Sequence, residues 1–214
     1  MKITKSLPLK ILFLIVTSFV MIENTFAQSQ RAGVKGGLNV SNLYVDEASD
    51  ENARIGIHAG FYGQLFPSDV FTIQPELLFS TRGAKYESDL GGFGNQQVTF
   101  NLSYIDLPVL AVFKVAEVVE IHAGAYASYL LKADVSYEGD LGNGTDQIDE
   151  DNLKSFDYGL VAGVGINFGA IQIGARYNYG LVEIADSDGA DSILGDAKNS
   201  NAQLYIAFDF LQSK

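Results

Sequence analysis

The chain has 214 residues, a formal net charge of −12 at pH 7 and no cysteine. The lack of cysteine excludes disulfides and thiolate metal sites within this sequence. There is no basic patch, no phosphate-binding loop and no dinucleotide-binding fingerprint, which argues against nucleic-acid and nucleotide ligands. Because 47% of the residues are hydrophobic, the fold must bury or otherwise accommodate a large apolar surface.

The amino-terminal segment has the pattern of a secretory signal. Three lysines occur among its first ten residues, an apolar run covers residues 11–22, and Thr25 and Ala27 occupy the small-residue positions of a cleavage site. We therefore expect residues 1–27 to be removed, leaving a mature domain over residues 28–214. A single membrane anchor at the amino terminus is the alternative interpretation.

Eight later segments alternate between apolar and polar residues, a pattern typical of strands with two unlike faces. One face carries large aliphatic and aromatic side chains, and the other is rich in glycine with single charges of both signs. The segments are 31–41, 54–64, 71–82, 104–114, 119–132, 156–168, 171–181 and 201–210.

The connections between these segments alternate between short and long. The short ones are 66–69, 115–118 and 169–170, and the long ones are 42–53, 83–98, 133–155 and 184–199. The four long connections together hold 17 acidic and three basic residues, so the acidity of the chain belongs to its loops. This arrangement predicts an all-β fold: an eight-stranded antiparallel up-and-down transmembrane β-barrel with short periplasmic turns and long extracellular loops.

A soluble barrel with its apolar face inward is the alternative fold. The large apolar side chains on every strand favour contact with lipid instead. Eight strands enclose a narrow lumen that side chains fill, so charges on the inner face should pair with one another and leave no open channel. The predicted polar network of the lumen comprises Lys35, His58, Glu76, Arg82, Asp106, Lys114, Glu120, His122, Arg176 and Asp209.

Two prolines test this barrel model. Pro75 and Pro108 fall in the middle of predicted neighbouring strands, almost opposite each other across the connection 83–98. Proline lacks the backbone N–H that a strand ladder needs, and a closed barrel has no free edge to accommodate it. We expect a bulge or a missing ladder hydrogen bond at this position.

The two histidines occur in similar phrases, "IHAGFYG" from Ile57 and "IHAGAYA" from Ile121. A lipid hydrolase or acyl transferase would need a Ser–His–carboxylate set open to the membrane. Both His58 and His122 fall on the predicted inner face, and no nucleophile-elbow motif is present. We therefore predict no catalytic residues and no cofactor.

A metal site is also not expected. The segments 146–152 and 186–192 are rich in oxygen ligands, but neither has the spacing of an EF-hand loop. Loose binding of divalent cations near lipopolysaccharide phosphates is the alternative for these segments.

Several segments resemble the PorT-like family of outer-membrane β-barrels found in Bacteroidota. The most specific part is "QPELLFSTRGAKY", from Gln74, followed by "YIDLPVL", from Tyr104. The resemblance covers nearly the whole mature chain and implies an eight-stranded outer-membrane barrel. The namesake of the family is implicated in a secretion system that exports proteins across the outer membrane.

Together these features predict a non-enzymatic protein of the bacterial outer membrane, exported by a cleaved signal peptide. Its role would be structural or interactive, through its acidic loops or as an accessory of an envelope or secretion complex. The alternatives are a small-solute pore and a lipid-modifying enzyme. The expected partners are outer-membrane lipid, lipopolysaccharide and proteins of such a complex, but neither nucleic acid nor nucleotide.

Overall fold

The computed structural model describes residues 31–44, 52–66, 68–89, 95–139, 142–147, 153–184 and 198–212. The predicted signal segment lies outside the described residues, as do large parts of the four long connections. Within the described residues, no helix is long and apolar enough to cross a membrane.

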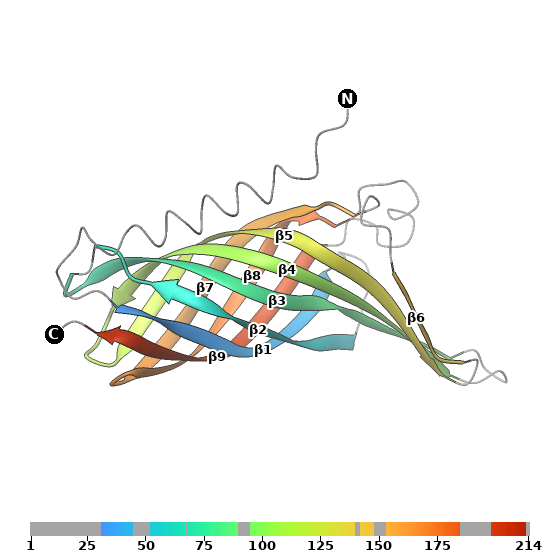
Figure 1. Ribbon diagram of the computed structural model, residues 1–214, viewed down its shortest axis with the longest axis horizontal. Helices are drawn as coiled ribbons and strands as arrows, with labels where there is room; N and C mark the ends of the chain where they lie inside the picture. Colours follow the sequence, from blue (N-terminus) through green and yellow to red (C-terminus); the bar gives the residue numbers. More distant parts are fainter. Residues whose placement is uncertain are drawn as a thin grey trace, which may run out of the picture.

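The described residues form nine antiparallel strands (Figure 1). They are β1 (Arg31–Tyr44), β2 (Asn52–Gly63), β3 (Phe71–Asp89), β4 (Asn95–Lys114), β5 (Val119–Gly139), β6 (Gly144–Gln147), β7 (Phe156–Phe168), β8 (Ile171–Glu183) and β9 (Lys198–Gln212). Eight of them close a ring in the order β1-β2-β3-β4-β5-β7-β8-β9, in which β9 pairs with β1, while β6 pairs only with β5. The predicted all-β antiparallel up-and-down barrel is confirmed.

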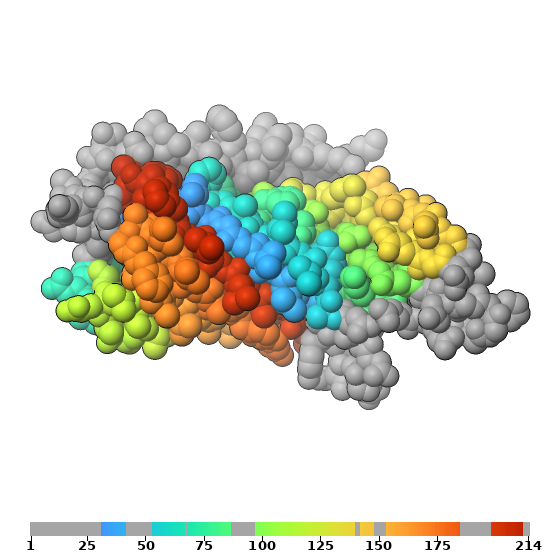
Figure 2. All heavy atoms as spheres, turned by 90° about the horizontal axis from the view of Figure 1, so that it is seen from below, coloured from blue at the N-terminus to red at the C-terminus, as the bar shows by residue number. Residues whose placement is uncertain are grey.

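The short turns lie at one end of the ring, called the turn end here, and the long connections lie at the loop end. Alternation of side chains along each strand separates an inner face from an outer one. On β1, for example, Lys35 and Asn39 are buried in the lumen, whereas Val34 and Leu38 are exposed on the outer wall. The outer wall is apolar on every strand of the ring and is partly visible in Figure 2. Such an outer face suits lipid.

Paired aromatic side chains lie near both ends of this wall. The rings of Phe71 and Phe113 are 5.2 Å apart near the turn end, and those of Tyr129 and Phe156 are 5.1 Å apart toward the loop end. Aromatic girdles of this kind flank the lipid-facing band of transmembrane barrels.

One side of the barrel is much longer than the other. Strands β3, β4 and β5 have 19, 20 and 21 residues, whereas the other five strands of the ring have 12 to 15. Their extra length projects beyond the ring at the loop end and is extended sideways by β6 (Figure 1). We call residues 86–89, 95–103 and 131–139 together with β6 the distal extension. It occupies parts of the connections 83–98 and 133–155 that were predicted to be loops, and that prediction is wrong for these residues.

The β3–β4 ladder is interrupted at the two prolines. Pro75 pairs with Val109 and Leu78 pairs with Asp106, in the same register, but the two residue pairs between them are missing. The missing N–H groups explain the gap, because Pro75 and Pro108 cannot donate to the ladder. The predicted loss of ladder hydrogen bonds is confirmed, without a bulge.

A bulge does occur further along, between β4 and β5. Tyr104 lies opposite Leu130, but its neighbour Ser103 lies opposite Lys132, so Leu131 is an extra residue. The bulge inverts the faces of β5 beyond this point. Lys132, which the strict alternation assigns to the inner face, therefore has a side chain that is 55% exposed, and Ala133 is buried instead.

Candidate functional site

Most of the side chains that fill the lumen are polar and are arranged in levels along the barrel axis, beside a buried apolar cluster of Leu110, Val112, Tyr126 and Val161. Strand β3 gives their order, because it runs from the turn end to the loop end and its inward residues follow one another along that path. Glu76 belongs to a level nearer the turn end, and Arg82 to a level nearer the loop end. Each level contains at least one buried ion pair.

The middle level is centred on Glu76. Its carboxylate accepts hydrogen bonds from Lys35 Nζ at 2.6 Å and from both terminal nitrogens of Arg176 at 2.9 and 3.0 Å. The ring of Tyr205 lies beside both cations, 4.2 Å from Lys35 Nζ and 5.0 Å from Arg176 Cζ. A bidentate guanidinium and cation–π contacts are the interactions that make a buried ion cluster tolerable.

The next level toward the loop end is centred on Arg82. Its guanidinium lies 2.5 Å from an oxygen of Asp106 and 3.3 Å from an oxygen of Asp157. Ser128 and Tyr126 donate hydrogen bonds to these two carboxylates, at 2.6 and 3.1 Å respectively. One cation thus holds two carboxylates together. The Ser128 hydroxyl satisfies the remaining oxygen of Asp106, whereas Asp157 Oδ1 is buried without a partner among the described residues.

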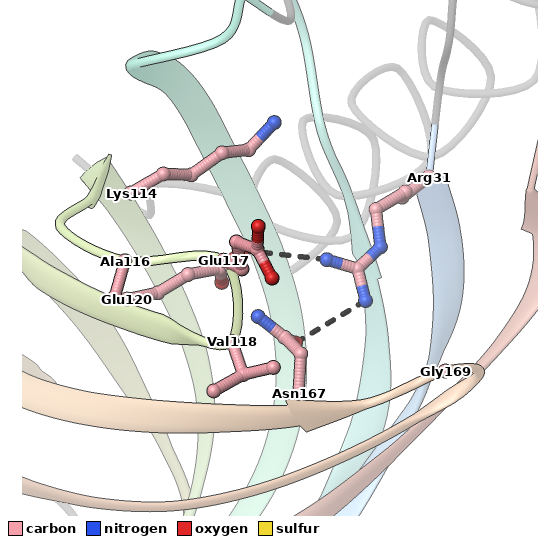
Figure 3. A pocket seen from close by; sticks show the side chains of 8 residues that line it. All are labelled: Arg31, Lys114, Ala116, Glu117, Val118, Glu120, Asn167 and Gly169. Atoms are coloured by element: carbon pink, nitrogen blue, oxygen red, sulfur yellow. Dashed lines mark hydrogen bonds and ion pairs between the residues drawn. The ribbon is translucent and has the colours of Figure 1, made fainter.

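A third ionic level closes the turn end. The guanidinium of Arg31, at the start of β1, lies 2.5 Å from Asp209. It also lies 3.3 Å from Glu120 and donates to the side-chain oxygen of Asn167 at 3.3 Å (Figure 3). Tyr62 also donates a hydrogen bond to Asp209. Arg31 therefore links three strands across the mouth of the barrel.

Neutral polar side chains lie between the ionic levels. Asn39 accepts hydrogen bonds at its side-chain oxygen from His58 Nδ1 at 2.8 Å and from Gln203 at 2.9 Å, for one tautomer of the histidine. The Nε2 atoms of His58 and His122 and both side-chain polar atoms of Asn201 are buried without a partner among the described residues.

The structure places nine of the ten predicted lumen residues inside the barrel, all of them buried. Lys114 is the exception: it lies at the turn end and its Nζ donates to the backbone oxygen of Ser68 at 3.0 Å. Sequence reasoning missed Arg31 and Asp157, which complete two of the ionic levels. Both have inward parity on their strands, so the alternation could have identified them.

The mouth at the loop end is closed differently, by an apolar cluster called the apolar cap here. Its members are Ala84, Leu102, Tyr104, Leu130, Ala133, Leu153 and Ile184, with Tyr86 packed against them. Leu153 and Ile184 come from two predicted loops and are held side by side by a hydrogen bond from Lys154 N to Ile184 O. The cap shields the Arg82 level from water.

The two histidines do not form a catalytic set within the described residues. His58 bonds to Asn39, and His122 lies beside the ring of Tyr205, with 6.1 Å between ring centroids. Both face the lumen rather than lipid. No group of three or more potential metal ligands occurs among the described residues. Of the two acidic segments considered for cations, only residues 146–147 are described, so those hypotheses lie outside the structure.

Comparisons with known proteins agree with this architecture. A family model described as outer membrane protein beta-barrel domain matches residues 26–186. No curated protein is significantly similar in sequence. Similar solved structures include Ail, the attachment invasion locus protein of Yersinia pestis (14% identity, TM-score 0.49), whose match covers 86% of this chain and 100% of that chain.

Two further solved structures are similar at a lower level. They are Neisserial surface protein A (12% identity, TM-score 0.47, covering 85% of this chain and 97% of that chain) and OprG from Pseudomonas aeruginosa (9% identity, TM-score 0.36, covering 85% and 93%). Because the family model spans most of the strand ring, the chain belongs to the outer membrane protein beta-barrel domain family and is a protein of the bacterial outer membrane.

Proposed function

We propose that this protein is a non-enzymatic outer-membrane barrel that presents its distal extension and acidic loops to binding partners outside the cell. The turn end then faces the periplasm and the loop end faces outward, as in other barrels of this topology. On the resemblance of its strands, we further propose that it is a PorT-like barrel, exported by a cleaved signal peptide and acting with other envelope or secretion proteins.

The observation that carries this proposal is the unequal length of the strands. A strand tilted in a bilayer needs only about 9–11 residues to cross it. Strand β5 has 21 residues, so roughly ten of them, or about 33 Å of strand, lie beyond the lipid. A sheet extended this far and widened by β6 contributes little to the closure of the ring, which supports a role in contacts with other molecules.

The chemistry of the extension also favours an interaction surface. Its outward residues are mostly polar, with the exposed Leu131 at the bulge as an exception. Asn101 donates to Ser136 at 3.2 Å, and Ser136 lies 3.3 Å from Thr145 of β6. Of its described acidic residues, Asp134 is paired with Lys132 at 2.7 Å, which leaves Glu138 and Asp146 as the acidic side chains of this sheet without an ion pair among the described residues. A cationic partner could pair with these two carboxylates.

A small-solute pore is the second candidate, and the ionic levels argue against it. A solute would have to pass the Arg31, Glu76 and Arg82 levels, each of which joins side chains from different strands across the lumen. Planar-bilayer recordings of the purified protein are expected to show no discrete conductance steps. Steps that scale with solute size would favour the pore.

A lipid-modifying enzyme is the third candidate. His58 and His122 are buried in the lumen, away from the lipid-facing wall. We expect the double variant His58→Ala, His122→Ala to leave the lipid A composition of its host unchanged. A change that tracks the loss of both imidazoles, with the barrel still folded, would support the enzyme.

The interaction role is best tested by shortening the distal extension without disturbing the ring. Tyr86 and Val98 are paired across the β3–β4 hairpin, so an Asn-Gly turn can replace residues 87–97 between them. Proteins cross-linked to the barrel on intact cells would be compared between the full chain and the shortened one. We expect the shortened chain to lose its extracellular partners.

A matched control separates the effect of removing the strand ends from the effect of removing their acidic side chains. The variant Glu87→Gln, Asp89→Asn removes the same two acidic side chains but keeps the strands. Loss of partners only in the shortened chain would assign binding to the extended sheet. Folding of all three chains would be checked by their heat-modifiable migration on gels. If all three folded chains were cross-linked to the same partners, a role for the extension would be contradicted.

A further inference from the structure

A pocket of about 350 Å³ opens at the turn end, beside the turn that joins β4 to β5. Its lining is Arg31, Lys114, Ala116, Glu117, Val118, Glu120, Asn167 and Gly169. Figure 3 shows Lys114 and Arg31 on opposite sides, with carboxyl oxygens between them. The pocket therefore combines two cations and two carboxylates, on the side of the membrane where the short turns lie.

Half of these charges are already used by the barrel itself. Arg31 pairs with Glu120 and Asp209, and the second oxygen of Glu120 accepts a hydrogen bond from Gln172 at 2.8 Å. The side-chain oxygen of Asn167 accepts from Arg31 and from Gln172. These groups form a fixed floor whose ionic requirements are satisfied.

Two opposite charges in the pocket have no charged partner among the described residues. Lys114 Nζ donates to a neutral backbone oxygen, that of Ser68. Glu117 is exposed and has no hydrogen bond or ion pair within the described part of the chain. A ligand that carries one negative and one positive group could therefore satisfy both side chains at once, whereas a simple anion would meet the carboxylates of Glu117 and Glu120.

The position of the pocket identifies the source of such a ligand. Val115 and Val118, on the same turn, are 57% and 48% exposed. They continue the apolar outer wall formed by Phe113 and Ile121 on the two adjoining strands. The wall meets lipid, so the headgroups of the periplasmic leaflet lie at the level of this turn, one short loop away from the pocket.

We propose that this pocket binds the headgroup of a zwitterionic phospholipid that carries a primary amine, such as phosphatidylethanolamine. Its phosphate pairs with Lys114, and its ammonium donates hydrogen bonds to the carboxylate of Glu117. Its acyl chains run along the outer wall past Val115. This inference rests on the orientation proposed above, with the turn end facing the periplasm, but not on the role proposed for the distal extension.

The test uses the full chain reconstituted in vesicles of equal parts phosphatidylethanolamine and phosphatidylglycerol. Lipids retained after gentle extraction are counted by native mass spectrometry. We expect the wild-type protein to retain phosphatidylethanolamine preferentially. The variant Glu117→Gln should lower this preference roughly two- to fivefold, as for the loss of one partly exposed ion pair.

Two further variants sharpen the test. Lys114→Met should reduce the retention of both lipids, because both carry the phosphate. Glu138→Gln changes an exposed carboxylate on the distal extension, far from the pocket, and should leave retention unchanged. Glu117 has no hydrogen bond or ion pair with any residue that the structure describes, so its substitution should not disturb folding even if that of Lys114 does.

Three outcomes would overturn the proposal. The first is equal retention of the two lipids by the wild-type protein, and the second is an unchanged preference in Glu117→Gln. The third is equally tight binding of soluble glycerophosphoethanolamine, which would identify a free periplasmic solute rather than a membrane lipid as the ligand.

Discussion

The ring of the barrel and its distal extension are parts of the same strands, yet they follow opposite rules. On β4 within the ring, Leu107 and Val109 face outward, and Asp106 faces the lumen. Further along the same strand Leu102 is buried on the inner side, and Asn101 lies on the outer side. The outward residues of β4 thus change from apolar to polar near Tyr104. The outer face of β4 is therefore suited to lipid within the ring and to water in the distal extension.

The difference shows that the interior of one continuous sheet can be stabilised in two ways. Inside the ring, polar groups are kept from water by the narrow lumen and depend on pairing with one another. Under the extension, the apolar cap depends on burial and close packing. The two interiors should therefore respond to different kinds of substitution, and the predictions below separate them.

The largest effect is expected at the centre of the ring. Glu76→Gln leaves Lys35 and Arg176 buried together without a carboxylate, which should cost about 3–5 kcal/mol of the free energy of unfolding. Urea unfolding in lipid vesicles would measure it, with Glu138→Gln as the exposed control. A loss under about 1 kcal/mol would contradict a dry ionic lumen in which Lys35 and Arg176 both keep their charge.

The stability of the apolar cap should depend less on the charge of a substituted side chain and more on its volume. Leu102 is only 2% exposed, so Leu102→Ala should lower the free energy of unfolding by about 2–5 kcal/mol. Val109→Ala, on the outer wall of the same strand, is the control, because it removes methyl groups without opening a cavity. If Leu102→Ala and Val109→Ala lowered the free energy of unfolding by the same amount, the apolar cap would not be a packed core.

Gly83 lies where the ring passes into the extension and has a φ of +148°. A Cβ added there would collide with the backbone oxygen of Phe100. We expect Gly83→Ala to cost about 1–3 kcal/mol, as for strained backbone positions. Gly142 also has a positive φ, +127°, but a Cβ there would meet nothing within 4 Å.

Comparison of the two alanine variants by thermal unfolding isolates the collision from the backbone strain. Gly83→Ala should be the more damaging of the two. Equal losses would mean that backbone strain alone limits both positions, and that Phe100 can move away.

The ring could be predicted from the sequence because one rule holds along eight segments. Large apolar residues such as Ile57 or Ile206 recur at every second position, and closure in an even number of antiparallel strands follows from the alternation of short and long connections. The prolines were also informative, because Pro75 and Pro108 remove ladder donors wherever their strands pair.

The extension could not be predicted in the same way, although part of its pattern was present. Val98, Phe100 and Leu102 alternate with polar residues just before the predicted strand at Tyr104. They have the opposite parity to the lipid-facing residues of that strand. A search for one continuous apolar face therefore stops where the apolar residues change parity, and it does not include this segment in the strand. The apolar cap was missed for another reason: Leu153 and Ile184 are single residues in loops, without any periodicity.

The bulge beside Tyr104 could not be predicted from the alternation at all. Its effect is seen at Lys132, whose side chain lies on the outer face. Without the bulge this side chain would be buried next to the Arg82 level. Instead it lies outside, 2.7 Å from Asp134. We expect Lys132→Met to change the free energy of unfolding by only about 0.2–1 kcal/mol, because exposed ion pairs are screened by water and salt.

Unfolding measured at low and at high ionic strength would test this smallest effect. The difference between Lys132→Met and the wild-type protein should shrink as salt is added. Lys35→Met, which removes an equally charged side chain from the dry interior, is the matched comparison and should remain several times more costly at both salt concentrations. A large loss of unfolding free energy in Lys132→Met that does not depend on salt would instead indicate that this lysine lies in the lumen. In that case there would be no bulge between the ring and the distal extension.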